Sequence, residues 1–109
     1  MTISTHVLDT ARGRPAAGVP VTLEVRDAQG DWSEVGSGTT DDDGRLPDLL
    51  AEPLVAGVYR LTFHTDAYFA DRQSFYPQVS VVFRVADPEE HHHVPLLLSP
   101  YAFSTYRGS

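Results

Sequence analysis

The chain has 109 residues and a mass of 12.0 kDa, the size of one domain with a single hydrophobic core. Its formal net charge is −7 and all eight basic residues are arginine, which argues against a surface that binds nucleic acid through phosphates. The absence of cysteine excludes disulfides, thiolate metal sites and cysteine nucleophiles. No apolar run is long enough to span a bilayer or to form a secretory signal, so we expect a cytoplasmic protein with no membrane partner.

Alternation of apolar and polar residues predicts strands along the whole chain. In chain order the alternating segments are 4–9, 19–25, 32–37, 59–63, 79–85, 91–99 and 101–107. The pattern is clearest in the second, fourth and fifth of these. Turn-forming residues separate several of the segments, at 28–31, 41–44 and 56–57. Short strands at this spacing predict an all-β sandwich that forms one domain over residues 1–109.

One short helix is expected at 66–73. Asp66 is placed to act as its N-cap residue, and Pro77 prevents the helix from extending further. Its length predicts a peripheral position.

The two faces of the predicted strands differ in the side chains that they present. Side chains at i and i+2 share a face, so Ser4, His6 and Leu8 form one row of the first strand. If Val94 and Phe103 face the core, the opposite face combines that row with His93, Leu97, Ser104 and Tyr106. A monomer seldom leaves such a mixed apolar and aromatic surface in water, so we expect association through a two-fold contact that forms a groove. The alternative is a half-solvated sheet face with ordinary polar residues.

Histidines 91–93 suggest a metal site, because imidazole is a common metal ligand. His91 and His93 can share a strand face, but a third ligand such as His6 would be needed, and we expect no bound metal. A metal-dependent hydrolase built on this pair is kept as an alternative, with chelation as its test. The aspartates at 41–43 lack the alternating spacing of a calcium loop and predict a solvated turn.

Arg45 follows that turn and has two interpretations. In an acidic protein a lone cation at the mouth of a sheet marks a place for an anionic substrate, and a surface arginine paired with a neighbouring aspartate is the alternative. No phosphate-binding loop or nucleophile elbow is present. Two histidines, an arginine and nearby hydroxyl groups suit the activation of water and the stabilisation of an oxyanion.

The sequence resembles the 5-hydroxyisourate hydrolases, the transthyretin-related enzymes of purine catabolism, over essentially its whole length. The residues that carry the resemblance are the segments STHVLDT at 4–10, DGR at 43–45, FYPQV at 75–79, HVPLLLSP at 93–100 and YRGS at 106–109. The last tetrapeptide is the most specific of these motifs.

The resemblance implies a transthyretin-like sandwich of two four-stranded sheets with one short helix. It also implies a homotetramer, a dimer of dimers whose central channel holds the active sites, and no cofactor. By the same resemblance, the catalytic residues are His6, Arg45 and His93. The implied substrate-binding residues are Ser104, Tyr106, Arg107, Gly108 and Ser109.

The implied reaction is ring-opening hydrolysis of 5-hydroxyisourate to 2-oxo-4-hydroxy-4-carboxy-5-ureidoimidazoline. Our hypothesis is that His6 or His93 takes a proton from water while Arg45 anchors the ring and stabilises charge, without a covalent nucleophile. Which histidine is the base stays open. A transthyretin-like carrier that binds a small molecule in the channel is the main alternative. His64, His91 and His92 are interpreted as structural or surface residues, and Trp32 as a packing residue.

Overall fold

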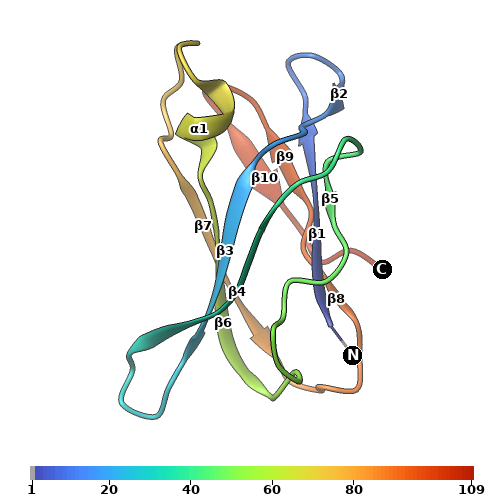
Figure 1. Ribbon diagram of the computed structural model, residues 1–109, viewed down its shortest axis with the longest axis vertical. Coiled ribbons are helices and arrows are strands. Elements are labelled where there is room, and N and C mark those ends of the chain that lie inside the picture. The colour runs from blue at the N-terminus through green and yellow to red at the C-terminus, as the bar shows by residue number, and fades with distance from the viewer. Residues whose placement is uncertain (1) are drawn as a thin grey trace.

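The computed structural model describes residues 2–109, which form two β-sheets packed face to face (Figure 1). One sheet is antiparallel and four-stranded, in the order β4-β3-β6-β7. Its strands are β3 (Pro20–Arg26), β4 (Trp32–Thr39), β6 (Gly57–Phe63) and β7 (Val79–Val85). Each of them coincides with a segment predicted from alternation.

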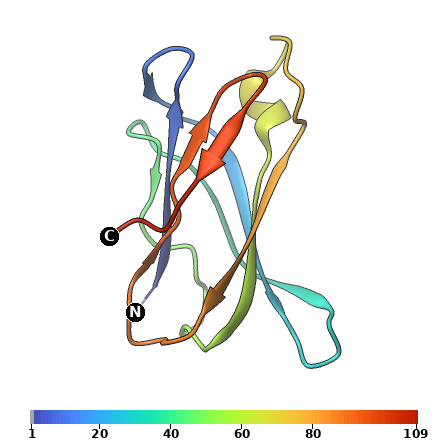
Figure 2. The same cartoon turned by 180° about the vertical axis from the view of Figure 1, so that it is seen from behind.

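The second sheet is built around β1 (Ile3–Asp9). Its other strands are β2 (Arg14–Pro15), β5 (Arg45–Leu46), β8 (His92–His93), β9 (Leu96–Leu98) and β10 (Phe103–Thr105). Strands β8 and β9 run parallel to β1 along one edge, and β10 lies beyond β9 (Figure 2). Strands β2 and β5 run antiparallel along the other edge, where Val7 accepts a hydrogen bond from Ala16 and donates one to Gly44.

The expected sandwich of two sheets is confirmed. The second sheet contains six strands in four rows, because β2 and β5 share one row beside β1 and β8 and β9 share the other. The segment predicted as one strand at 91–99 is divided at Pro95, which has no N–H group to donate to the sheet. Strands β2 and β5 were not predicted. Each has only two residues, too few to show any alternation.

The inner rows of the two sheets form the core. Ile3 and Val7 are fully buried, whereas His6 and Leu8 on the opposite face of β1 are partly exposed. This confirms the division of the first strand into two rows. Val94 is buried as expected, but Phe103 is 39% exposed and packs against Tyr76, with 5.1 Å between ring centroids. Phe103 therefore covers an edge of the sandwich instead of facing the core.

The helix α1 (Thr65–Phe69) is shorter than predicted. It ends because Ala70 adopts a positive φ of 55°, which an α-helix does not allow. The N-cap position is occupied by His64, so the expectation that Asp66 caps the helix is wrong. No helix within residues 2–109 has the length and apolar character that crossing a membrane requires.

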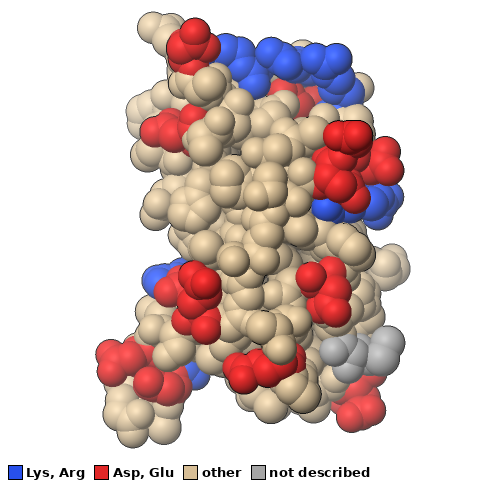
Figure 3. All heavy atoms as spheres, in the orientation of Figure 1, with Lys and Arg blue, Asp and Glu red and all other residues tan. Residues whose placement is uncertain are grey.

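A buried carboxylate ties α1 to the turn after β1. Asp9 is 1% exposed and accepts a hydrogen bond from the Tyr68 hydroxyl at 2.6 Å and two from backbone N–H groups of the turn. The guanidinium groups of Arg12 and Arg72 lie within 4.0 Å of it. Figure 3 shows the basic side chains that gather at this end of the molecule. Burial raises the pKa of Asp9, but these hydrogen bonds and the charge of Arg72 outweigh it and lower the pKa overall.

We expect Asp9→Ala to lower the free energy of unfolding by about 3 kcal/mol, because it leaves buried donors without an acceptor. Since the pKa of Asp9 is lowered in the folded state, its stabilisation is complete above the unfolded value near 3.9 and is lost as pH falls through the folded value. Urea unfolding at several pH values measures both effects. Asp9→Asn should remove this acid dependence, and Tyr68→Phe should show a smaller loss. Wild-type stability of Asp9→Ala at pH 7 would contradict the assignment.

Candidate active site

The turn before β5 places Arg45 beside His6. These two residues are paired in the register of β1 and β5, so their side chains share a face of the sheet. The carboxylate of Asp41 accepts hydrogen bonds from the backbone N–H groups of Asp43 and Arg45, both at 2.9 Å. Gly44 has a φ of 75°, and a Cβ atom there would lie 2.4 Å from the carbonyl oxygen of Val7. Glycine thus allows the turn to lie directly against β1.

The side chains of His6 and Arg45 differ in their hydrogen bonding. Nε2 of His6 lies 2.8 Å from the carbonyl oxygen of Asp43, and since a carbonyl only accepts, Nε2 carries the proton and Nδ1 is the unprotonated nitrogen of neutral His6. Arg45 is exposed and forms none of the ion pairs found within residues 2–109. Its aspartate neighbours thus do not neutralise it, which leaves its guanidinium available to an anionic group.

His93 lies on β8, on the other side of β1 from Arg45. It is paired in register with Ser4, which is two residues before His6 and on the same face. The Ser4 hydroxyl lies 2.7 Å from Nδ1 of His93. The backbone N–H of Gly108 donates to the carbonyl of His93 at 2.8 Å, and a Cβ at Gly108 would lie 2.5 Å from Cδ2 of the ring. The last residues therefore hold one edge of the imidazole in place.

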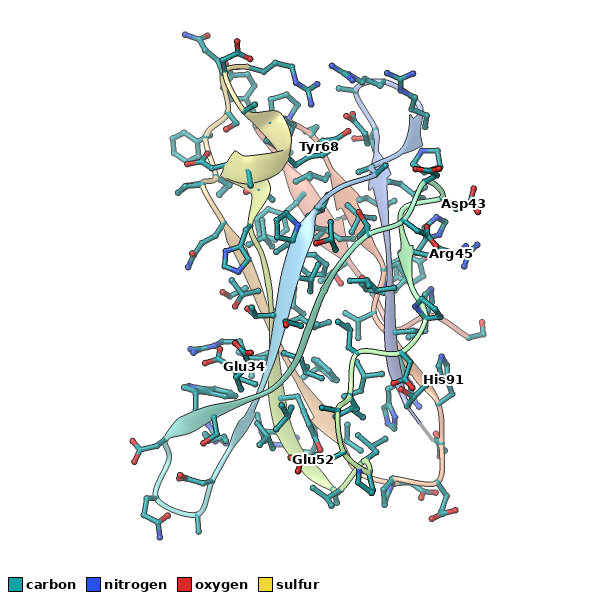
Figure 4. All side chains as sticks on the ribbon, viewed as in Figure 1. Glu34, Asp43, Arg45, Glu52, Tyr68 and His91 are labelled. Carbon is teal, nitrogen blue, oxygen red and sulfur yellow. The ribbon has the colours of Figure 1, made fainter. Side chains whose placement is uncertain are left out.

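Arg45 and His93 line an open cleft of about 300 Å³ on the outer face of the six-stranded sheet, whereas His6 is not part of its lining. Its lining residues are Ser4, Thr5, Arg45, Pro47, His91, His93 and Ser109. Figure 4 shows Arg45 and His91 along the same side of the sheet, with the end of the chain emerging between them. Imidazole, guanidinium and hydroxyl groups line the cleft, and no carboxylate side chain does. The cleft therefore suits a polar or anionic small molecule.

The predicted substrate-binding residues do not all meet there. Gly108 packs against His93, and Ser109 lines the cleft. Ser104 lies in a separate hollow beside Leu97. Tyr106 and Arg107 line a small apolar pocket next to β7, and Arg107 donates a hydrogen bond to Glu90 at 2.8 Å. Within one chain, two of the five predicted residues are at the cleft.

Four residues of the cleft were not predicted as site residues, and two of these, Ser4 and His91, are hydrogen-bonded to each other. His91 was interpreted as structural, and Ser4 was noted only as a member of the outer row. The Ser4 hydroxyl lies 2.9 Å from Nε2 of His91 as well as against His93. The sequence did contain a signal for His91, because His91 and His93 are two residues apart and therefore share a strand face. Residues 2–109 contain no group of three or more His, Cys, Asp or Glu side chains arranged to bind a metal ion.

The electrostatic surroundings favour the neutral form of His93. Burial lowers its pKa, and the positive charges of His91, His6 and Arg45 lower it further. We expect an NMR titration of the ring Cε1 proton to give a midpoint below the ordinary value near 6.5. His91→Ala should raise that midpoint, because it removes a positive charge. A midpoint above 6.5 in the wild-type protein would contradict the described surroundings.

Comparisons with known proteins agree on one family. The family model described as HIUase/Transthyretin family matches residues 3–108. A protein from Salmonella dublin named 5-hydroxyisourate hydrolase is 46% identical over 110 residues, which are 98% of this chain and 80% of that protein.

Solved structures give the same result. The Klebsiella pneumoniae 5-hydroxyisourate hydrolase has a TM-score of 0.87 and 39% identity, with all of both chains covered. Sea bream transthyretin in complex with thyroxine has a TM-score of 0.90 and 34% identity, covering 99% of this chain and 95% of that one. The chain therefore belongs to the HIUase/Transthyretin family.

Proposed function

We propose that this protein hydrolyses 5-hydroxyisourate in the degradation of urate. The observation that carries the proposal is the cleft in which His93 and Arg45 meet on the outer face of the six-stranded sheet. The similarity to the Salmonella dublin and Klebsiella pneumoniae proteins, both named 5-hydroxyisourate hydrolase, supports the same substrate.

His93 is the better candidate for the general base. Its lowered pKa keeps the ring neutral near pH 7, and no protein hydrogen bond within residues 2–109 occupies its Nε2 atom. His6 instead has its Nε2 proton committed to the Asp43 carbonyl. We therefore assign the base to His93 and the role of an orienting neighbour of Arg45 to His6.

The reaction needs one water molecule and no cofactor. As the water oxygen bonds to the ring carbonyl carbon, its proton passes to Nε2 of His93, and the carbonyl oxygen becomes negative. The guanidinium of Arg45, which has no ion-pair partner within the described chain, stabilises that charge. The ring carbon–nitrogen bond then breaks, and the leaving nitrogen takes the proton back from His93.

A carrier remains the alternative, because sea bream transthyretin, solved with thyroxine, shares the fold. An assay that generates 5-hydroxyisourate in situ from urate with urate oxidase, and then follows its absorbance, distinguishes the two functions. We expect the decay rate to increase in proportion to the protein concentration. A decay rate unchanged by the protein would favour the carrier.

We also propose a homotetramer, arranged as a dimer of dimers. Support comes from the edge strands β7 and β10 and from the exposed side chains of Val82, Phe103 and Tyr106, an apolar area that association would bury. The roles predicted for Ser104, Tyr106 and Arg107 belong to this assembly, where surfaces of neighbouring copies would meet. Light scattering after size exclusion tests it, with about four times 12.0 kDa expected and the mass of a monomer contradicting it. The cytoplasmic location stays a prediction.

A further inference from the structure

The hydroxyl group of Ser4 bridges two histidines. Its Oγ lies 2.7 Å from Nδ1 of His93 and 2.9 Å from Nε2 of His91. The two rings are stacked at 19° with centroids 6.5 Å apart, so the hydroxyl connects them along one side. Ser4 is buried, with 5% of its surface exposed. Three polar groups thus form one hydrogen-bonded row.

The number of protons in this row limits its arrangement. A hydroxyl has one proton to donate, so when Ser4 donates to one imidazole it accepts from the other. If His93 donates from Nδ1 to Ser4, and Ser4 donates to Nε2 of His91, then Nε2 of His93 is left unprotonated. That is the tautomer which a general base at Nε2 requires. The bridge to His91 thus allows the reactive form of His93.

A carboxylate lies near the far end of the row. Asp48 is held by hydrogen bonds from the Thr2 hydroxyl and from the backbone N–H of Leu50. These bonds lower the pKa of Asp48, burial raises it, and the nearby positive charge of His91 lowers it further. The far end of the row therefore lies near a negatively charged group.

We propose that Ser4 and His91 are positioning residues that form a proton relay behind His93. When Nε2 of His93 receives a proton from water, the Nδ1 proton passes to Ser4, and the Ser4 hydroxyl proton passes to Nε2 of His91. The positive charge moves from His93 to His91, beside Asp48, and returns when His93 protonates the leaving nitrogen. No atom or electron is gained or lost in the relay. The relay rests on the proposed function, because its first proton comes from the attacking water.

The charges around the relay set its pH dependence. The groups that face it are His6 on β1, Arg45 on β5, Asp48 after β5 and His91 just before β8. The nearby Arg107 is paired with Glu90. His91 lowers the pKa of His93, so removing it should raise the pKa and move the acid limb of the kcat/KM profile to higher pH. Ser4→Ala keeps the charge of His91 and should move this limb less.

The deciding measurement is a proton inventory of kcat in H₂O/D₂O mixtures, on the full chain with 5-hydroxyisourate generated from urate. We expect a curved inventory for the wild type, because several protons move together, and a linear one for Ser4→Ala and His91→Ala. Both variants should lose on the order of 10-fold in kcat with little change in KM, the lower end of the range known for hydrogen-bond partners that orient metal-bound histidines. Ser4→Thr, which keeps the hydroxyl, should restore the curvature.

His91 is exposed, so its replacement is not expected to affect folding, and His64→Ala, at the N-cap position of α1, is the matched control. Unchanged kcat and an unchanged inventory in Ser4→Ala and His91→Ala would overturn the relay while the hydrolase function stood. Equal losses in Ser4→Ala and Ser4→Thr would overturn it as well. If the wild-type protein failed to accelerate the decay, the proposed function itself would fail. These outcomes separate the two proposals.

Discussion

The His93→Ala variant is expected to lose about 100- to 10,000-fold in kcat for 5-hydroxyisourate hydrolysis, the range typical of a missing general base. His93 lines the cleft and combines a lowered pKa with an Nε2 atom that no protein hydrogen bond within residues 2–109 occupies. The ring is half-buried and its neighbour Gly108 contacts it through the backbone, so the fold should persist. Circular dichroism and the mass in solution check that it does.

The comparison with His6→Ala tests which histidine is the base. We expect a smaller loss for His6→Ala, because its contribution passes through the Asp43 carbonyl and the turn that positions Arg45. His64→Ala, at the N-cap position of α1, should retain wild-type activity. A larger loss for His6→Ala than for His93→Ala would reverse the assignment, and near-normal kcat in both would remove histidine base catalysis from the mechanism.

Replacing Arg45 by alanine is expected to lower kcat/KM by about 100- to 1,000-fold, the loss seen when one donor to a developing oxyanion is removed. Part of the loss should appear in KM, since the same guanidinium binds the polar ring of the substrate. Steady-state kinetics with substrate generated from urate separate the two parts. Arg45 is exposed, so its removal should leave the free energy of unfolding nearly unchanged.

Two variants give this prediction its controls. Arg14→Ala removes another exposed arginine that pairs along the same edge of β1, and it should leave activity intact. Arg45→Lys keeps the charge but loses the planar donor geometry, so it should recover only part of the activity. Full activity in Arg45→Lys would show that charge alone suffices. Equal losses of activity in Arg14→Ala and Arg45→Ala would mean that the net charge of the protein, and not the position of Arg45 at the cleft, determines the activity.

Most of the fold was predictable because half-buried strands alternate. Seven segments were predicted, and the structure has strands in all of them. The two strands β2 and β5 were not predictable, because a two-residue strand has no period and exists only where β1 supplies partners. The early end of α1 was also not predictable from the sequence, because it depends on the backbone conformation of Ala70.

The site was predictable in part and for different reasons. The resemblance indicated His6, Arg45 and His93, and the register of β1 explains how segments far apart in sequence reach one face. The part played by Ser4 could not be predicted, because a serine in a strand is common and only the distances to two rings distinguish it. The positions of Ser104 and Arg107 depend on tertiary contacts that an alternating pattern does not encode. The sequence alone therefore did not predict where these two side chains lie.

The position of β1 has a consequence for synthesis of the protein on the ribosome. Its parallel partners β8 and β9 begin at His92, 89 residues after Ile3, so this strand is made first and one of its two edges is paired last. At a translation rate of about 5–20 residues per second, β1 waits roughly 4–18 s for them. During that time its apolar row is open to chaperones and to other nascent chains. A chain released before its last twenty residues is therefore expected to be insoluble or degraded, whatever the intrinsic stability of the finished domain.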